Sequence, residues 1–232
     1  MFVRLINKII YIILVMIIPL VILFSCVNLV AYDLNHYKGL YLKFGISEEI
    51  GMENEELIKA TTNLLDYLKG NRDSLDFKAV VQNDEVEFFS NRDKLHMIDV
   101  KNIFVSISIL RSYLFALLLV AIIIITFVKR LRQDIGRLLI FSTILGILPF
   151  LLLIFLILMD FNKYFTVFHE IFFDNDLWLL DPKADRLINI FPEKFFAYSA
   201  LKILIYYFTV MVILFILGFV IKQKSKRESG LL

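Results

Sequence analysis

The sequence predicts an all-α polytopic membrane protein with four transmembrane helices and two extracytoplasmic loops that form a small cap, and three observations support this fold class. Apolar residues make up 59% of the 232 residues, and the mean hydropathy is +0.75. A soluble domain contains nearer to about 45–50% apolar residues, which disfavours a water-soluble globule. The apolar residues also collect in four long stretches, and the segments between these stretches alternate in net charge.

The four apolar stretches cover about residues 8–31, 102–128, 138–159 and 196–221. Each is close to or longer than the roughly 20 residues that a helix needs to cross the hydrocarbon core. In the core, a helix is the only open-chain element that satisfies its own backbone hydrogen bonds. We therefore expect four spanning helices within a single integral membrane domain, residues 1–232.

The charges of the connecting segments predict the orientation of these helices. The N-terminal stub, the tight turn after the second span and the C-terminal tail together carry a net charge of +8. The other side carries −8, with nine basic and 14 acidic residues in 32–101 and three basic and six acidic residues in 160–192. Because basic residues favour the cytoplasmic side, we expect both termini there, with the loops at about 32–101 and 160–195 facing outward.

The first outer loop is predicted to contain a short helix and a β-hairpin. Apolar residues recur at helical spacing over residues 57–68 after an acidic opening, and Gly70 ends the pattern. Residues 77–81 and 86–89 are typical of two short strands joined through residues 82–84. The second outer loop is dense in Phe and Trp, which is typical of an interfacial aromatic belt.

Common catalytic motifs are mostly absent from the chain. It has no GxSxG elbow, no GxxxxGK[ST] phosphate loop and no GxGxxG turn. His169-Glu170 opens like the zinc motif HExxH, but Phe173 stands where the second histidine is required. The single cysteine, Cys26, excludes an internal disulfide and any CxxC site.

Histidine is the informative residue type, because all three histidines fall in the outer segments. His36 lies in the first loop, His96 just before the second span, and His169 just after the third. An imidazole titrates near neutral pH, so two of them at one membrane surface could provide a base and an acid. The simpler interpretation is that these are surface or packing histidines.

Residues near His96 extend this candidate site. If the second helix begins before His96, Asp99 lies on the same face and could orient the ring. Arg111 is rotated by only about 60° from that face, and either snorkels to the surface or lines a polar cavity. Asn28 and Tyr32 belong to a polar stripe on the first span, which either packs against another helix or faces the same cavity.

Two separated groups of residues around these histidines resemble the pattern of the lipoprotein intramolecular transacylases (Lit). The four-span topology with two outer loops is also similar, so the resemblance covers nearly the whole chain except about residues 43–89. The segments that carry it are Leu95–Lys101, Phe168-His169, Asn175–Trp178, Leu180–Pro182, Asp185, Leu187-Ile188 and Phe191–Glu193.

The resemblance implies a reaction on the lipoproteins of Gram-positive bacteria. The sn-2 acyl chain of a diacylglyceryl-cysteine moves to the α-amino group of the same cysteine, which gives the lyso form. Catalysis is then expected from His96 and His169, with His169 as base and His96 as acid or oxyanion donor, although the sequence leaves open which is which. The residues expected to support the site or bind substrate are Asp99, Asp176, Trp178, Arg111, Asn28 and Tyr32.

From this resemblance we expect a monomer in the cell membrane that contacts membrane lipids and diacylglyceryl-modified lipoproteins, with no cofactor, no metal and no nucleic-acid partner. Two other functions stay open from the sequence. One is a non-enzymatic adaptor that binds an envelope protein through its outer loops. The other is a zinc-dependent membrane hydrolase with His96, His169 and either Asp99 or Asp176 as ligands.

Overall fold

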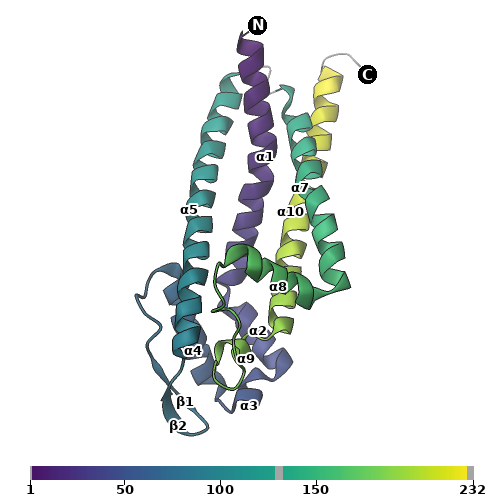
Figure 1. Ribbon diagram of the computed structural model, residues 1–232. Coiled ribbons are helices and arrows are strands. Elements are labelled where there is room, and N and C mark those ends of the chain that lie inside the picture. The colour runs from purple at the N-terminus through teal and green to yellow at the C-terminus, as the bar shows by residue number, and fades with distance from the viewer. Residues whose placement is uncertain (1, 129–132, 229–232) are drawn as a thin grey trace. The chain divides into compact units, whose positions relative to one another are not determined.

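The computed structural model describes residues 2–128 and 133–228 and is dominated by four long helices (Figure 1). They are α1 (Phe2–Ala31), α5 (Asn91–Phe127), α7 (Ile135–Met159) and α10 (Glu193–Glu228). Each contains a stretch that is long and apolar enough to cross a membrane. The predicted fold class is therefore confirmed. Helix α5 extends well beyond the predicted second span, because a charged first segment joins the apolar stretch without a break.

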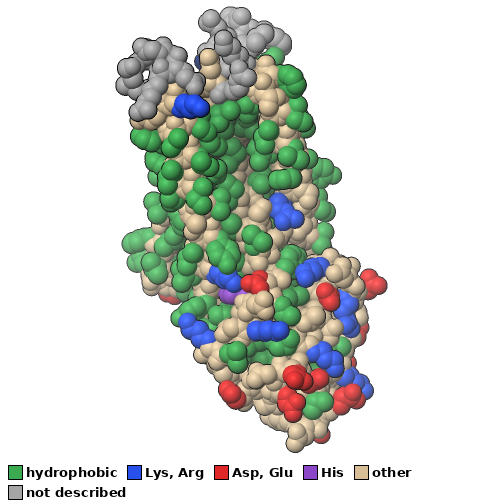
Figure 2. Space-filling model, turned by 180° about the vertical axis from the view of Figure 1, so that it is seen from behind, with side chains coloured by type: hydrophobic (Ala, Val, Ile, Leu, Met, Phe, Trp, Pro, Cys, Tyr) green, Lys and Arg blue, Asp and Glu red, His purple; other side chains and the backbone are tan. Residues whose placement is uncertain are grey.

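The contacts divide the chain into two compact units, whereas the sequence predicts one domain. The span unit contains residues 1–28, 108–159 and 202–232, and the cap unit contains residues 29–107 and 160–201. Figure 2 shows hydrophobic side chains over the long helices and many acidic and basic side chains over the cap unit. The residues outside the bilayer stretches thus have a core of their own, and each unit is described by itself below.

Small residues bring the helices of the span unit close together. A Cβ atom on Gly146 of α7 would lie 2.7 Å from Pro19 of α1 and 2.7 Å from the hydroxyl of Tyr207 in α10. That hydroxyl donates a hydrogen bond to the Gly146 carbonyl at 3.0 Å. Only glycine allows this approach, and a close backbone contact of this kind stabilises helix association in lipid.

The cap unit is built mainly from short helices. They are α2 (Leu34–Phe44), α3 (Ile46–Ile50), α4 (Asn54–Lys69), α8 (Phe161–Phe172) and α9 (Leu187–Ile190). Helix α4 confirms the predicted helix: Leu57 and Leu64 are buried, and Gly70 ends the helix at φ +80°. Helices α2, α3, α8 and α9 were not predicted.

The β-hairpin is present with a shorter turn than predicted. Strands β1 (Lys78–Val81) and β2 (Asp84–Glu87) pair antiparallel, with Lys78 opposite Glu87 and Val81 opposite Asp84. Gln82 and Asn83 form the turn at φ +52° and φ +70°. Two left-handed residues match the twist of paired strands, so Asp84 belongs to the strand rather than to the connection.

Aromatic rings form much of the cap-unit core. Tyr37 and Tyr41 of α2 pack against Phe191 and Phe195, with ring centroids 5.2 to 6.2 Å apart. Tyr37 also donates a hydrogen bond to the Ala31 carbonyl at 2.8 Å. These contacts attach α2 to the start of α10 inside the cap unit.

Candidate active site

A reciprocal hydrogen-bonded box fixes the first turn of α5. The backbone N–H of Asp93 donates to the Ser90 hydroxyl at 2.9 Å, and the Asp93 carboxylate accepts from the Ser90 N–H at 3.1 Å. These two hydrogen bonds satisfy backbone N–H groups that have no partner within the helix at its first turn. The box therefore sets where α5 begins, one turn before His96, as the sequence hypothesis required.

The same box attaches α5 to the chain that follows α8. The fully buried Asp93 carboxylate also accepts from the N–H groups of Arg186 at 3.1 Å and Leu187 at 3.4 Å. The Ser90 hydroxyl donates to the buried carboxylate of Asp185 at 2.6 Å. Segments almost one hundred residues apart in the sequence are thereby held together beside His96.

The structure brings His96 and His169 together. Their ring centroids lie 6.2 Å apart at an interplanar angle of 35°. Phe173 contacts both rings, with centroid distances of 5.1 Å to His96 and 5.6 Å to His169. His36 is elsewhere in the cap unit, where its Nε2 atom lies 2.9 Å from the Ser199 hydroxyl.

The backbone of α8 determines the tautomer of His169. Its Nδ1 atom lies 2.7 Å from the Phe165 carbonyl, which can only accept a hydrogen bond, so Nδ1 carries the proton and Nε2 is the acceptor. Burial lowers the pKa of His169 below its usual value, against an opposing contribution from the Phe165 carbonyl. A neutral imidazole with a free Nε2 lone pair is the form that a general base needs.

The ring of His169 lies in an aromatic enclosure. Trp178 stacks on it with centroids 4.9 Å apart at 25°, and Phe165 contacts it edge-on at 4.5 Å. These rings hold the imidazole in one orientation and limit its contact with water. Trp178, predicted to support the site, thus lies directly against one of the two histidines.

His96 is more deeply buried, with 6% of its surface exposed. Its Nδ1 atom is buried and has no hydrogen-bond partner among residues 2–128 and 133–228. Buried polar atoms are nearly always hydrogen-bonded in folded proteins, so this unpartnered ring nitrogen is an exception.

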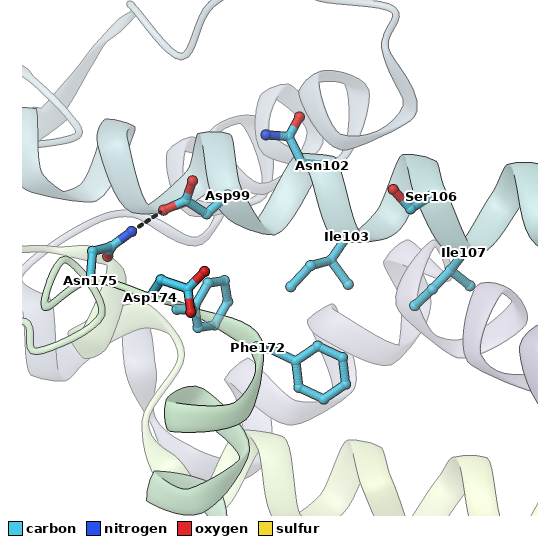
Figure 3. A pocket seen from close by; sticks show the side chains of 9 residues that line it. Asp99, Asn102, Ile103, Ser106, Ile107, Phe172, Asp174 and Asn175 are labelled. Atoms are coloured by element: carbon cyan, nitrogen blue, oxygen red, sulfur yellow. Dashed lines mark hydrogen bonds between the residues drawn. The ribbon is translucent and has the colours of Figure 1, made fainter.

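Figure 3 shows the residues that line a pocket of about 460 Å³, which neither histidine lines. Phe173 forms part of its wall and also contacts both imidazole rings. Asp99 lines it as well and accepts a hydrogen bond from the Asn175 side chain at 2.9 Å. No hydrogen bond links Asp99 to His96 in the described part of the chain. Burial lowers the pKa of His96, and the charge of Asp99 opposes this shift.

The other predicted residues are spread over both units. Asp176 is exposed, and its backbone carbonyl accepts a hydrogen bond from the Arg92 guanidinium. Tyr32 packs on Phe104 with centroids 5.8 Å apart. Asn28 and Arg111 belong to the span unit rather than to the unit that carries the histidines.

Three contributors to the site were not predicted. Asn175 stood in the matched pattern without a role, and the Phe165 carbonyl has no side-chain signature. Asp93 could have been found, because Ser90-x-x-Asp93 has the spacing of a capping box. Within the described ranges, no group of three or more His, Cys, Asp or Glu side chains could hold a metal ion.

Comparison with known proteins gives one family. The model of the lipoprotein intramolecular transacylase Lit matches residues 12–196. The structure of the Bacillus cereus lipoprotein intramolecular transacylase Lit is similar over 96% of this chain and 98% of that chain, with 24% identity and a TM-score of 0.83. A variant of that enzyme with one histidine replaced by alanine has 23% identity and a TM-score of 0.79 over 97% of this chain and 98% of that chain. Among curated protein sequences, none matches this chain.

Proposed function

The chain belongs to the lipoprotein intramolecular transacylase (Lit) family, and from this premise we propose that His96 and His169 together catalyse the acyl transfer. The protein is a multi-pass membrane acyltransferase of lipoprotein maturation. A non-enzymatic adaptor is therefore set aside. The observation that carries the proposal is the pair of imidazoles, whose ring centroids lie 6.2 Å apart. The backbone carbonyl of Phe165 sets the tautomer of one of them, His169.

The proposed substrate is a lipoprotein whose N-terminal cysteine carries a diacylglyceryl group. The α-amino nitrogen attacks the carbonyl carbon of the sn-2 ester, a C–N bond forms, and the bond between that carbon and the glyceryl oxygen breaks. The amine supplies the nucleophile, so no activated serine or cysteine is required. Because both reacting groups belong to one molecule, holding them close supplies much of the rate enhancement.

His169 suits the role of base in this reaction. Its Nε2 lone pair accepts a proton from the attacking amine, while Nδ1 stays bonded to the Phe165 carbonyl. The imidazolium then returns that proton to the departing glyceryl oxygen. The low pKa of His169 supports this return, because a weakly basic imidazole releases its proton readily.

His96 suits the role of hydrogen-bond donor to the developing oxyanion. A buried neutral imidazole carries one N–H, and only 6% of the His96 surface is exposed. A donor in such surroundings stabilises a negative charge more strongly than it would in water. Phe172, Phe173 and Trp178 supply apolar surface for the acyl chains.

We also propose that both termini are cytoplasmic and that the histidines work at the extracytoplasmic face. The charge of the connecting segments supports this orientation, since +8 lies on one side and −8 on the other. In this arrangement a diacylated lipoprotein enters from the outer leaflet. A monomer that meets its substrate among membrane lipids is sufficient for the chemistry.

Mass spectrometry of lipoprotein N-termini from cells with and without this protein tests the proposal. We expect the lyso form only where the protein is present, and its near-complete loss in the single variants His96→Ala and His169→Ala. His36→Ala is the matched control and should keep full activity. An unchanged diacylglyceryl species with a free amine in both strains would refute the function. Retained activity in either variant, with the protein still inserted, would remove that histidine from the mechanism.

A further inference from the structure

In the part of the chain that the structure describes, His169 lies among aromatic rings and forms no salt bridge with a carboxylate. Its hydrogen bond goes to the Phe165 carbonyl, which orients the ring but carries no net charge. The proposed base therefore lacks the acid that stabilises the imidazolium in a Ser-His-Asp triad. The ionisable residues on the segments that pack against it include Glu170 of α8, Arg92, His96 and Asp99 of α5, and Asp174 and Asp176 of the segment after α8.

The surroundings of His169 disfavour its charged form. Burial lowers the pKa of the imidazole below its usual value. The neighbouring His96 ring supplies no negative charge to offset this effect. As the proposed base, however, His169 is positively charged from the moment it takes the proton of the amine until it passes that proton to the glyceryl oxygen. The imidazolium therefore needs a stabilising partner other than His96 or the Phe165 carbonyl.

Trp178 is placed to be that partner. The centroids of its indole ring and of the His169 imidazole lie 4.9 Å apart, and the two ring planes meet at 25°. The face of an aromatic ring is partly negative and attracts a cation within about 6 Å of its centroid, and indole attracts most strongly. Phe173 also faces the imidazole, at 5.6 Å and 34°, but a phenyl ring is the weaker partner. Trp178 thus offers the nearer and stronger π face of the two.

Hydrogen bonds to α5 hold the segment that carries Trp178. The Asn175 side chain donates to the Asp99 carboxylate at 2.9 Å, and the Arg92 guanidinium donates to the Asp176 carbonyl. Both contacts lie within three residues of Trp178 in the sequence. The indole is therefore already in place when a positive charge forms on the imidazole, and no reorganisation is needed at that moment.

We propose that Trp178 is a positioning residue for His169, and that the face of its indole ring stabilises the imidazolium formed during acyl transfer. This cation–π contact takes the place of the missing carboxylate. An uncharged ring stabilises a cation less than a carboxylate would, so the imidazolium still releases its proton to the leaving group. The inference rests on the proposed function for the reaction in which the charge forms, but the contact itself can be measured without substrate.

Fluorinated tryptophans test the contact, because each fluorine on the benzene ring of the indole withdraws electron density from its face and hardly changes its shape. Trp178 is the only tryptophan in the sequence, so a tryptophan-requiring host places the analogue at this position alone. Full-length protein is purified with tryptophan and with its mono-, di- and trifluoro analogues. Thermal unfolding checks that the four proteins fold alike. NMR titration then gives the pKa of His169, and lyso-product formation gives kcat.

We expect the pKa of His169 to fall with each added fluorine, by about 0.5–1 pH unit over the series. The kcat should fall in the same order, by about three- to ten-fold, because a less stabilised imidazolium makes a weaker base. His36, which packs against Tyr37 and Phe195, is the internal control, and it should titrate identically in all four proteins. In Trp178→Phe produced with the same analogues, neither the pKa of His169 nor kcat should depend on the analogue supplied.

A pKa of His169 that stays constant or rises along the series would overturn the inference, because an indole with a purely structural role keeps its shape in all four proteins. A pKa that falls while kcat stays constant would overturn the role of Trp178 in the reaction. Failure of the tryptophan-containing protein to form any lyso product would instead refute the proposed function, and the NMR titration would still decide whether the contact exists.

Discussion

Replacing Asp93 tests whether the hydrogen-bonded box at the start of α5 holds the active site together. In Asp93→Ala, the N–H groups of Ser90, Arg186 and Leu187 lose their acceptor. A buried donor without a partner costs about 1–3 kcal/mol. The contact to Leu187 is long at 3.4 Å, and the nearby Asp185 carboxylate repels that of Asp93, so we take the lower end of the range summed over the three donors. The expected loss is about 3 kcal/mol.

The assay is thermal unfolding of the purified protein in detergent. For a chain of this length, about 3 kcal/mol corresponds to a fall in Tm of roughly 6–12 °C. Asp93→Asn should lose about half as much, because one amide oxygen still accepts. Lyso-product formation should fall in both variants well below their Tm, since His96 lies one turn along the helix. Glu49→Ala, at an exposed position of α3, should melt like the wild type. A Tm for Asp93→Ala within about 2 °C of wild type would refute the reasoning.

Two further measurements address His169, the proposed base, and the packing of the long helices. NMR titration of the His169 imidazole should give a midpoint below the usual 6.5, because burial disfavours the imidazolium. The variants His36→Gln and His96→Gln assign the histidine signals. A midpoint at or above 6.5 would contradict the buried setting of His169. Gly146→Ala should lower the Tm, since its Cβ would lie 2.7 Å from Pro19 and from Tyr207. Gly39→Ala is the control: no atom lies within 4 Å of the added Cβ, so the Tm should stay unchanged or rise. Equal effects of the two substitutions on the Tm would argue against close packing at Gly146.

The parts of the fold that could be predicted are those with a local signal. The four spans follow from uninterrupted apolar stretches, and α4 follows from its buried face and the glycine that ends it. Helix α8 was missed because its aromatic residues suggested an interfacial belt, which hid the helical spacing of Phe161, Phe165, Phe168 and Phe172. In this segment the aromatic composition indicates a membrane-interface belt, whereas the spacing of the same residues indicates a helix.

The sequence indicated candidate residues for the site but not their geometry. His96 and His169 were identified by their places beside two spans and by the family pattern. The link between Asp99 and Asn175 joins residues 76 positions apart, and the contact of Asp93 with Leu187 joins residues 94 apart. No local pattern encodes such a pair, because only the packed cap unit brings the two segments together.

The hydrogen bond from His169 to the Phe165 carbonyl makes the tautomer of His169 insensitive to substitution at position 165. Every amino acid supplies the same backbone carbonyl, so no side-chain exchange there can remove the acceptor while α8 stays helical. The helix geometry sets the tautomer, because it places the carbonyl of the residue four positions earlier next to the ring. Substitution at this position can therefore change the aromatic packing against the imidazole without altering which nitrogen carries the proton.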